Sequence, residues 1–203
     1  MNKNTIENAI EYVKCFFANE STGHDYYHTM RVFNCATNIA LAEGANLEIV
    51  QLCALLHDID DHKISPQTHE NLDNAKAFLL QNGANTEEIE QICEIIKGIS
   101  YSKNGDIAPE SIEGKCVQDA DRLDAIGAIG IARAFAFGGS RGRYMYKPDN
   151  EASKESTIDH FYDKLFKLKD LMNTESARKI ADERDKFMHE YIDEFYAECN
   201  GNK

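Results

Sequence analysis

The sequence of 203 residues has no tryptophan, only three prolines, and six cysteines of which no two form a Cys-x-x-Cys pair. So few prolines leave long helices almost uninterrupted, because proline removes a backbone donor and breaks a helix. The scattered cysteines argue against a disulfide framework and against a structural zinc site built from thiolates. We expect reduced cysteines that pack as small hydrophobic residues.

Positive charge is also scarce, with 22 lysines and arginines against 35 aspartates and glutamates and a net charge of −13. An acidic surface repels phosphate backbones and anionic lipids, so we expect neither a nucleic-acid polymer nor a membrane as partner. No stretch is long and apolar enough to span a bilayer, and the first residues lack the apolar run of a signal peptide. The expected location is therefore cytoplasmic. A small phosphorylated substrate remains compatible with the charge, because one pocket can be locally positive.

Helical periodicity dominates the chain and predicts an all-α protein of about eight or nine helices. Apolar residues recur at helical spacing around residues 6–17, 89–99, 158–168 and 180–195. The length suits a single domain, which we divide into a core at about 1–135 and a helical extension at about 150–200. The glycine-rich, basic run 138–143 is expected to be a surface loop.

The segment Leu47–Leu56 differs from the others because it is apolar on nearly every face. A helix that is apolar all round belongs at the centre of a bundle. This segment is followed directly by His57 and Asp58. The sequence therefore predicts a polar pair at the end of the most buried helix.

Two further polar clusters interrupt the apolar pattern, at residues 23–32 and 119–125. In the first, His24, His28 and Arg31 have the spacing i, i+4, i+7, so in one helix they share a face. In the second, three aspartates compete as metal ligands: Asp119, Asp121 and Asp124. Two imidazoles and two carboxylates suit a first-row divalent ion and leave positions open for water and a phosphate oxygen.

The order of these clusters, and the residues around them, resemble a known family. The segments HDYYHTMRV, LLHDIDDHK, VQDADRLDAIGAIGIAR and HFYDKLFKLKDLM span most of the chain. They are similar to a branch of small bacterial phosphohydrolases in the HD-domain superfamily. The resemblance implies a helical HD-domain bundle with a C-terminal helical extension and one metal held by His28, His57, Asp58 and Asp121.

The resemblance also implies hydrolysis of a phosphoric ester or anhydride, with nucleotide pyrophosphohydrolase activity reported in this branch. The expected ion is Mn²⁺, with Mg²⁺, Co²⁺, Ni²⁺ and Fe²⁺ as alternatives. In related alarmone hydrolases an acidic pair follows the HD dipeptide by about one helical turn; here those positions hold Asp61 and His62. Only Asp61 can supply a carboxylate, so we take Asp58 and Asp61 as the catalytic candidates.

A nucleotide carries several negative charges, so cations beside the metal ligands are candidates for its phosphates. These candidates are His24, Arg31, Lys63 and Arg122. The predicted reaction is attack on phosphorus by a metal-activated water, with nearby cations stabilising the developing charge.

Two other functions fit parts of the pattern. One is a catalytically silent HD domain that serves as a nucleotide sensor or a partner module. The other is an HD-type di-iron oxygenase, which commonly needs further histidines between the HD pair and the distal aspartate. Only His62 and His69 lie in that interval.

Overall fold

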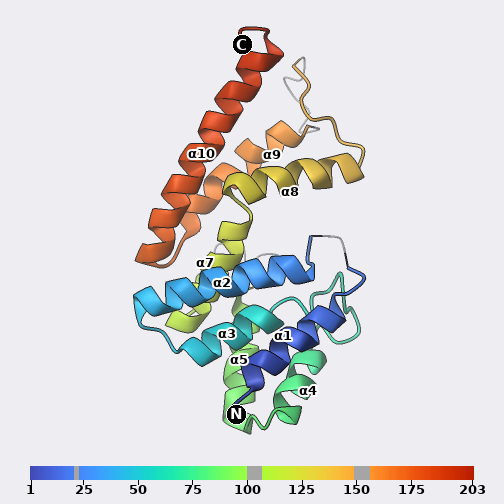
Figure 1. Cartoon of the computed structure of the whole chain (residues 1–203), viewed down its shortest axis with the longest axis vertical. Helices are drawn as coiled ribbons and strands as arrows, with labels where there is room; N and C mark the ends of the chain where they lie inside the picture. Colours follow the sequence, from blue (N-terminus) through green and yellow to red (C-terminus); the bar gives the residue numbers. More distant parts are fainter. Residues whose placement is uncertain (21–22, 100–106, 149–155) are drawn as a thin grey trace. The chain divides into compact units, whose positions relative to one another are not determined.

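The computed structural model describes residues 1–20, 23–99, 107–148 and 156–203 (Figure 1). In these ranges the protein is helical, without strands, and a single isolated β-bridge joins Tyr144 and Ser156. The predicted all-α class is therefore confirmed. Over the same ranges no helix has both the length and the apolar character needed to cross a membrane. The chain forms two compact units, Met1–Ala120 and Asp121–Lys203, and each is described by itself.

The first unit is built around one central helix. Its helices are α1 (Thr5–Phe16), α2 (Tyr26–Glu43), α3 (Leu47–Leu56), α4 (Asp73–Gln81), α5 (Thr86–Ile99) and the first turns of α7 (Ile112–Asp124). Three of them, α1, α2 and α5, pack against α3 (Figure 1). This arrangement places α3 at the centre of the unit, as its apolar sequence predicts.

Burial along α3 follows from its composition. Its last five residues, Leu52, Cys53, Ala54, Leu55 and Leu56, have no exposed surface. Asn46 begins the helix, where its side chain accepts a hydrogen bond from the backbone N–H of Ile49 at 3.4 Å. The helix ends at Leu56, and the chain then delivers His57 and Asp58 to the end of the buried core.

The segment that follows this pair is tied to α4 by a buried carboxylate. Asp60, 1% exposed, accepts hydrogen bonds from the backbone N–H groups of Asn74 at 3.2 Å and Ala75 at 2.9 Å. N–H groups in the first turn of a helix have no acceptor within the helix, so Asp60 caps α4 from another segment of the chain. Its backbone carbonyl also lies 2.8 Å from His69 Nδ1. Leu72, just before α4, has a left-handed φ of 55°, which costs a non-glycine residue free energy.

The second unit contains the end of α7 and four further elements. These are α8 (Gly127–Ser140), α9 (Thr157–Asp163), the 3₁₀ helix η1 (Leu165–Leu171) and α10 (Glu175–Cys199). Helix α10 packs against α8 and η1. Aromatic rings fill the space between helices, with Phe135 of α8 within 5.9–6.2 Å of the rings of Phe161, Tyr191 and Phe195.

Two expectations from the sequence are wrong in this unit. The stripe at residues 158–168 is not one helix, because the backbone breaks at Lys164 (φ −135°, ψ −56°) and continues as the 3₁₀ helix η1. The run 138–143 is not wholly a loop, because α8 continues to Ser140. Gly138 is buried, and a Cβ atom there would collide with the side chain of Thr157. The glycine permits close packing rather than a turn.

Candidate metal centre

The start of α2 positions His28. Asp25 is the N-cap residue, and its Oδ1 accepts a hydrogen bond of 2.7 Å from the backbone N–H of His28. The helix therefore begins at Tyr26, and His28, 1% exposed, points from its first turns into the unit. The expectation that His24 shares a helix face with His28 is wrong, because His24 precedes the cap.

The end of α3 orients His57. The Nδ1 atom of its ring lies 2.8 Å from the backbone carbonyl oxygen of Ala54. A carbonyl only accepts, so Nδ1 carries the proton and donates it, and in the neutral ring Nε2 then holds a lone pair. This is the tautomer that a metal ligand needs.

Three imidazole rings meet at one oxygen of Asp58. Its Oδ2 lies 2.8 Å from His24 Nδ1, 3.3 Å from His28 Nε2 and 3.2 Å from His57 Nε2. The three histidines come from the residue before the α2 cap, from α2 and from the end of α3. The structure thus brings together three of the four predicted metal ligands, His28, His57 and Asp58, and adds His24 to them.

These imidazoles determine the charge of Asp58. Burial by itself would raise the pKa of this carboxyl, but the charge of His57 and hydrogen bonds from all three rings outweigh it. The pKa of Asp58 therefore lies well below its ordinary value. Asp58 is an anion, as a metal-binding carboxylate must be.

The donor set fits a divalent cation. One ligand atom from each of His24, His28 and Asp58 lies within 4.8 Å of the others. When the His57 ring is neutral, its Nε2 lone pair and the anionic Asp58 Oδ2 are both acceptors, and they stand 3.2 Å apart. Two acceptors this close repel each other unless a proton on His57 or a metal ion lies between them, and an ion that accepts both nitrogen and oxygen ligands can take the place of that proton. The set contains no cysteine, unlike most structural zinc sites.

The turn after Asp58 carries two other predicted residues. The backbone N–H of Asp61 donates to the Asp58 carbonyl at 3.0 Å, and Asp61 Oδ1 accepts from the backbone N–H of Lys63 at 2.9 Å. These bonds keep Asp61 in the turn adjoining the ligands. Lys63 is exposed, and Arg31 is half-buried on α2.

The aspartates of α7 have different surroundings. Asp119 is fully buried in the first unit, whereas Asp121 is half-buried and is the first residue of the second. Asp124 forms an ion pair of 2.6 Å with Arg133, a partner that the sequence analysis missed. Arg122, 4% exposed, donates to the backbone carbonyl of Leu171 at the end of η1.

Sequence reasoning also missed two residues of the first unit. It treated His24 as a phosphate contact, not as a neighbour of Asp58, and it gave Asp60 no role. The signal for His24 was Asp25, whose place before Tyr26 and Tyr27 suits an N-cap. No sequence pattern links Asp60 to α4, because that bond depends on the tertiary fold.

Comparisons with known proteins show the family of this chain. The model of the HD domain family matches residues 25–126, which contain His28, His57, Asp58 and Asp121. The Bacillus subtilis protein YpgQ is 42% identical over 183 residues, covering 89% of this chain and 87% of YpgQ. Protein L803 of Acanthamoeba polyphaga mimivirus is 32% identical over 199 residues, covering 77% of this chain and 80% of L803.

Solved structures show the same fold. An HD-superfamily hydrolase from Bacillus thuringiensis has a TM-score of 0.84 and 40% identity, covering 98% of this chain and 99% of that one. The structure of Bacillus subtilis YpgQ in complex with ADP has a TM-score of 0.82 and 37% identity, and the match covers 96% of this chain and 95% of that chain. The family model covers half of the chain, and the likeness to these solved structures extends over nearly the whole of it. This chain therefore belongs to the HD-domain family.

Proposed function

We propose that this protein is a metal-dependent phosphohydrolase that cleaves a phosphoanhydride or phosphate ester bond of a nucleotide. The observation that carries the proposal is the meeting of three imidazole nitrogens at Asp58 Oδ2, within 2.8–3.3 Å. The HD-superfamily hydrolase among its structural relatives supports hydrolysis as the reaction class. The complex of the related YpgQ with ADP supports a nucleotide as the ligand.

The proposed metal ligands are His28, His57, Asp58 and Asp121. The first three lie together in the first unit. Asp121 is proposed as the fourth because it stands in the last turn of α7, a helix that begins in the first unit, and because it matches the distal aspartate of the family. A divalent ion bound there lowers the pKa of a bound water and polarises a phosphoryl oxygen.

The side chains around these ligands have distinct roles. His57 is held in one tautomer by its hydrogen bond to Ala54. His24 donates from Nδ1 to the anionic Asp58, so its Nε2 is the atom that exchanges a proton with water or with a phosphate oxygen. Asp61, fixed in the adjoining turn, is our candidate to take the proton of the attacking water.

Positive charge must compensate a substrate with several negative charges. Arg31 and Lys63 belong to the same unit as the three histidines and are proposed to stabilise charge on the phosphate oxygens. Arg122 remains a candidate from the sequence, although its bond to Leu171 gives it a structural role as well.

The test is a screen of the chelator-treated protein against nucleoside mono-, di- and triphosphates, with Mn²⁺ or another divalent ion added and the products resolved by ion-exchange chromatography. We expect metal-dependent release of phosphate or pyrophosphate from the wild type and its loss in His28→Gln. The matched control is His189→Gln, which alters an exposed histidine of α10. Equal turnover by His28→Gln and the wild type would contradict the proposal.

Nucleotide binding, iron content and oxygen uptake, measured on the same protein, separate the other two functions. A silent nucleotide sensor would bind nucleotides with every metal and release no product. An HD-type oxygenase would contain iron and consume oxygen. Either result would replace the hydrolase proposal.

A further inference from the structure

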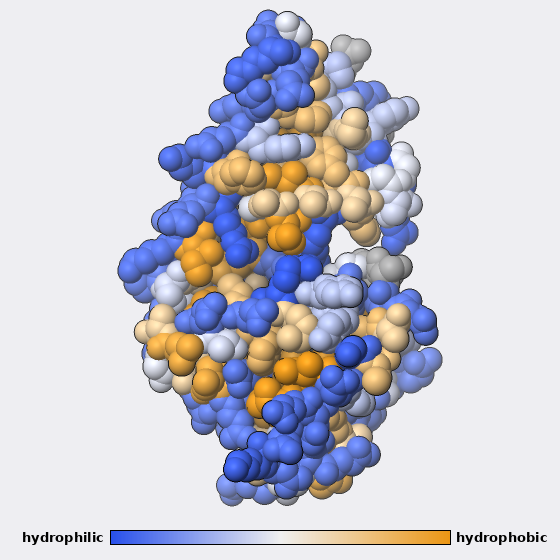
Figure 2. Space-filling view, in the orientation of Figure 1, coloured by the Kyte–Doolittle hydropathy of each residue, from blue (hydrophilic) through white to orange (hydrophobic). Residues whose placement is uncertain are grey.

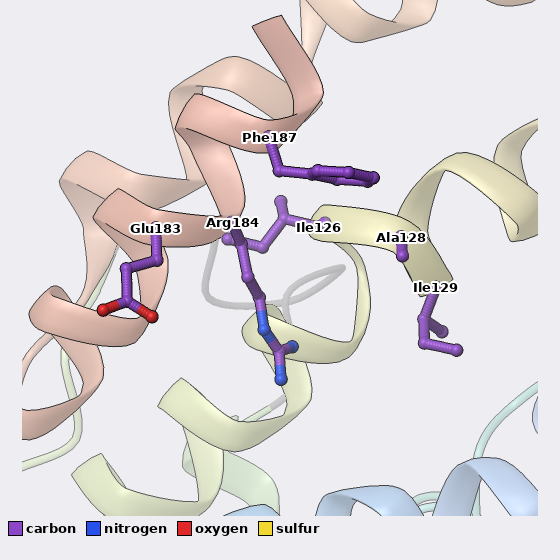
Figure 3. Close-up of a pocket in the computed structure, with 7 residues that line it drawn as sticks. Ile126, Ala128, Ile129, Glu183, Arg184 and Phe187 are labelled. Atoms are coloured by element: carbon purple, nitrogen blue, oxygen red, sulfur yellow. The ribbon is translucent and has the colours of Figure 1, made fainter. Parts of the chain in front are cut away.

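The second unit contains a cavity of about 330 Å³ where the turn between α7 and α8 meets α10 (Figure 3). Pockets for small ligands usually have about 300–1,000 Å³. The residues that line this one are Ile126, Gly127, Ala128, Ile129, Glu183, Arg184 and Phe187. None of them belongs to the proposed metal centre.

One wall of the cavity is apolar and partly open. Phe187 is 47% exposed and Ile129 is 42% exposed, although both are large hydrophobic residues. Hydrophobic residues gather over α8 on the face of the second unit seen in Figure 2. Figure 3 shows the ring of Phe187 extending from α10 above Ile126, with Ile129 on the neighbouring helix. An aromatic ring with exposed surface is suited to stacking against a planar aromatic group.

The other part of the cavity is a positively charged side chain held in place. Arg184 Nη1 donates to the backbone carbonyl of Leu123 at 2.5 Å. Its aliphatic stem packs on Gly127, where an added Cβ atom would lie only 2.9–3.1 Å from three carbons of Arg184. Gly127 also has a left-handed φ of 72°, which glycine adopts without strain. A guanidinium has five N–H donors, so the bond to Leu123 leaves capacity for a ligand oxygen.

The cavity is close to Asp121 along the chain and in the same unit. Its first lining residue, Ile126, follows Asp121 by five positions. Even a fully extended chain of five residues spans at most about 18 Å, and part of this interval is helical. Ile126 therefore lies within about 18 Å of Asp121, and Phe187 lines the same cavity as Ile126.

We propose that this cavity binds the base of the nucleotide substrate, with Phe187 stacking on the base and Arg184 bonding the ribose or the adjoining phosphate. This inference rests on the proposed function and adds the residues that recognise the nucleoside. The apolar wall suits a base, Arg184 suits the phosphate next to the ribose, and the carboxylate of Glu183 in the same lining suits a ribose hydroxyl. The volume is too small for a peptide helix.

The experiment measures binding without turnover. Isothermal titration calorimetry with Mn²⁺ compares an ATP analogue that has methylene groups at both anhydride positions with triphosphate that carries the same two methylene groups. Both compounds have the same chain of three phosphorus groups without a P–O–P bond, and only the analogue has a base. We expect the wild type to bind the analogue at least tenfold more tightly. Phe187→Ala should lose roughly tenfold in affinity for the analogue and keep its affinity for triphosphate.

Two further variants complete the test. Phe187→Tyr retains the ring and should retain the affinity for the analogue. Phe137→Ala removes an equally exposed ring of α8 outside the cavity, 50% exposed, and should leave both affinities unchanged. No binding by the wild type, equal affinities for its two ligands, or unchanged affinity of Phe187→Ala for the analogue would overturn the inference. Because no bond is cleaved, these results are independent of the hydrolysis screen.

Discussion

Replacing Asp60 tests how the segment that follows His57 and Asp58 is attached to α4. Its carboxylate is buried and accepts two backbone hydrogen bonds from the first turn of α4, from Asn74 and Ala75. Replacing Asp60 by Ala removes both acceptors. The backbone N–H of Ala75 is buried in this contact, whereas water can reach Asn74 more easily.

The expected loss of stability follows from these contacts. Leaving a buried donor unsatisfied costs about 1–3 kcal/mol, and removing a helix cap costs about 0.5–2 kcal/mol. The carboxylate also favours the positive end of the α4 dipole. We therefore expect Asp60→Ala to lower the free energy of unfolding by about 2–4 kcal/mol. For a chain of this size that corresponds to a fall in Tm of roughly 4–16 °C.

Two measurements check this expectation. Urea unfolding gives the change in free energy, and hydrogen exchange reports on the amides of Asn74 and Ala75 directly. Both amides should exchange faster in Asp60→Ala, while amides in α10 should keep their rates. Asp60→Asn retains one acceptor oxygen without the charge and should fall between the wild type and Asp60→Ala.

A loss below about 1 kcal/mol, with unchanged protection of Ala75, would refute the reasoning. It would mean that water replaces the carboxylate without cost. Left-handed Leu72 would then need another restraint to hold it in place.

Three other variants test separate parts of the structure. Asp58→Ala should weaken metal binding roughly 100-fold or more and abolish turnover, because even the loss of a hydrogen-bond partner of a metal ligand typically lowers metal affinity about 10–100-fold. Calorimetry that shows normal metal affinity would contradict this expectation. Arg122→Lys loses the planar guanidinium that donates to the carbonyl of Leu171 at the end of η1, so we expect a lower Tm with nearly constant kcat/KM. A tenfold fall in kcat/KM, about 1.4 kcal/mol, at unchanged Tm would instead indicate that Arg122 contacts phosphate. In Gly138→Ala the new methyl group would collide with Thr157, which should cost about 1–3 kcal/mol of stability. In the adjacent Gly139→Ala the methyl group meets nothing within 4 Å, and the variant should gain about 0.5–1 kcal/mol. Equal effects of the two variants in thermal unfolding would show that the close packing is absent.

The central features of this protein could be predicted from its sequence because they depend on local patterns. The segment Leu47–Leu56 is apolar on nearly every face, which fixes its burial, and its end determines where His57 and Asp58 emerge. The order of His28, this pair and the distal aspartates, together with the sequence around them, indicates the family, because it does not depend on how the helices pack.

Features that depend on contacts between distant segments could not be predicted. Gly138 looked like part of a loop because its packing partner, Thr157, lies on another helix. The break at Lys164 was hidden because apolar spacing over one turn is nearly the same in an α-helix and a 3₁₀ helix. Asp60 carries no visible signal, since its bonding partners are 14 and 15 residues away.

The bond between His57 and Ala54 makes the length of α3 a property of the proposed metal centre. If α3 continued for one more residue in regular geometry, the N–H of Asp58 would bond to the Ala54 carbonyl and compete with the imidazole for it. Because the helix stops at Leu56, one of its terminal carbonyls fixes the tautomer of His57, a role for which many metal sites use a second carboxylate. The restraint is thus part of the backbone. A change of the Ala54 side chain therefore leaves the acceptor in place, whereas an insertion or a proline that shifts the end of α3 would release the His57 ring.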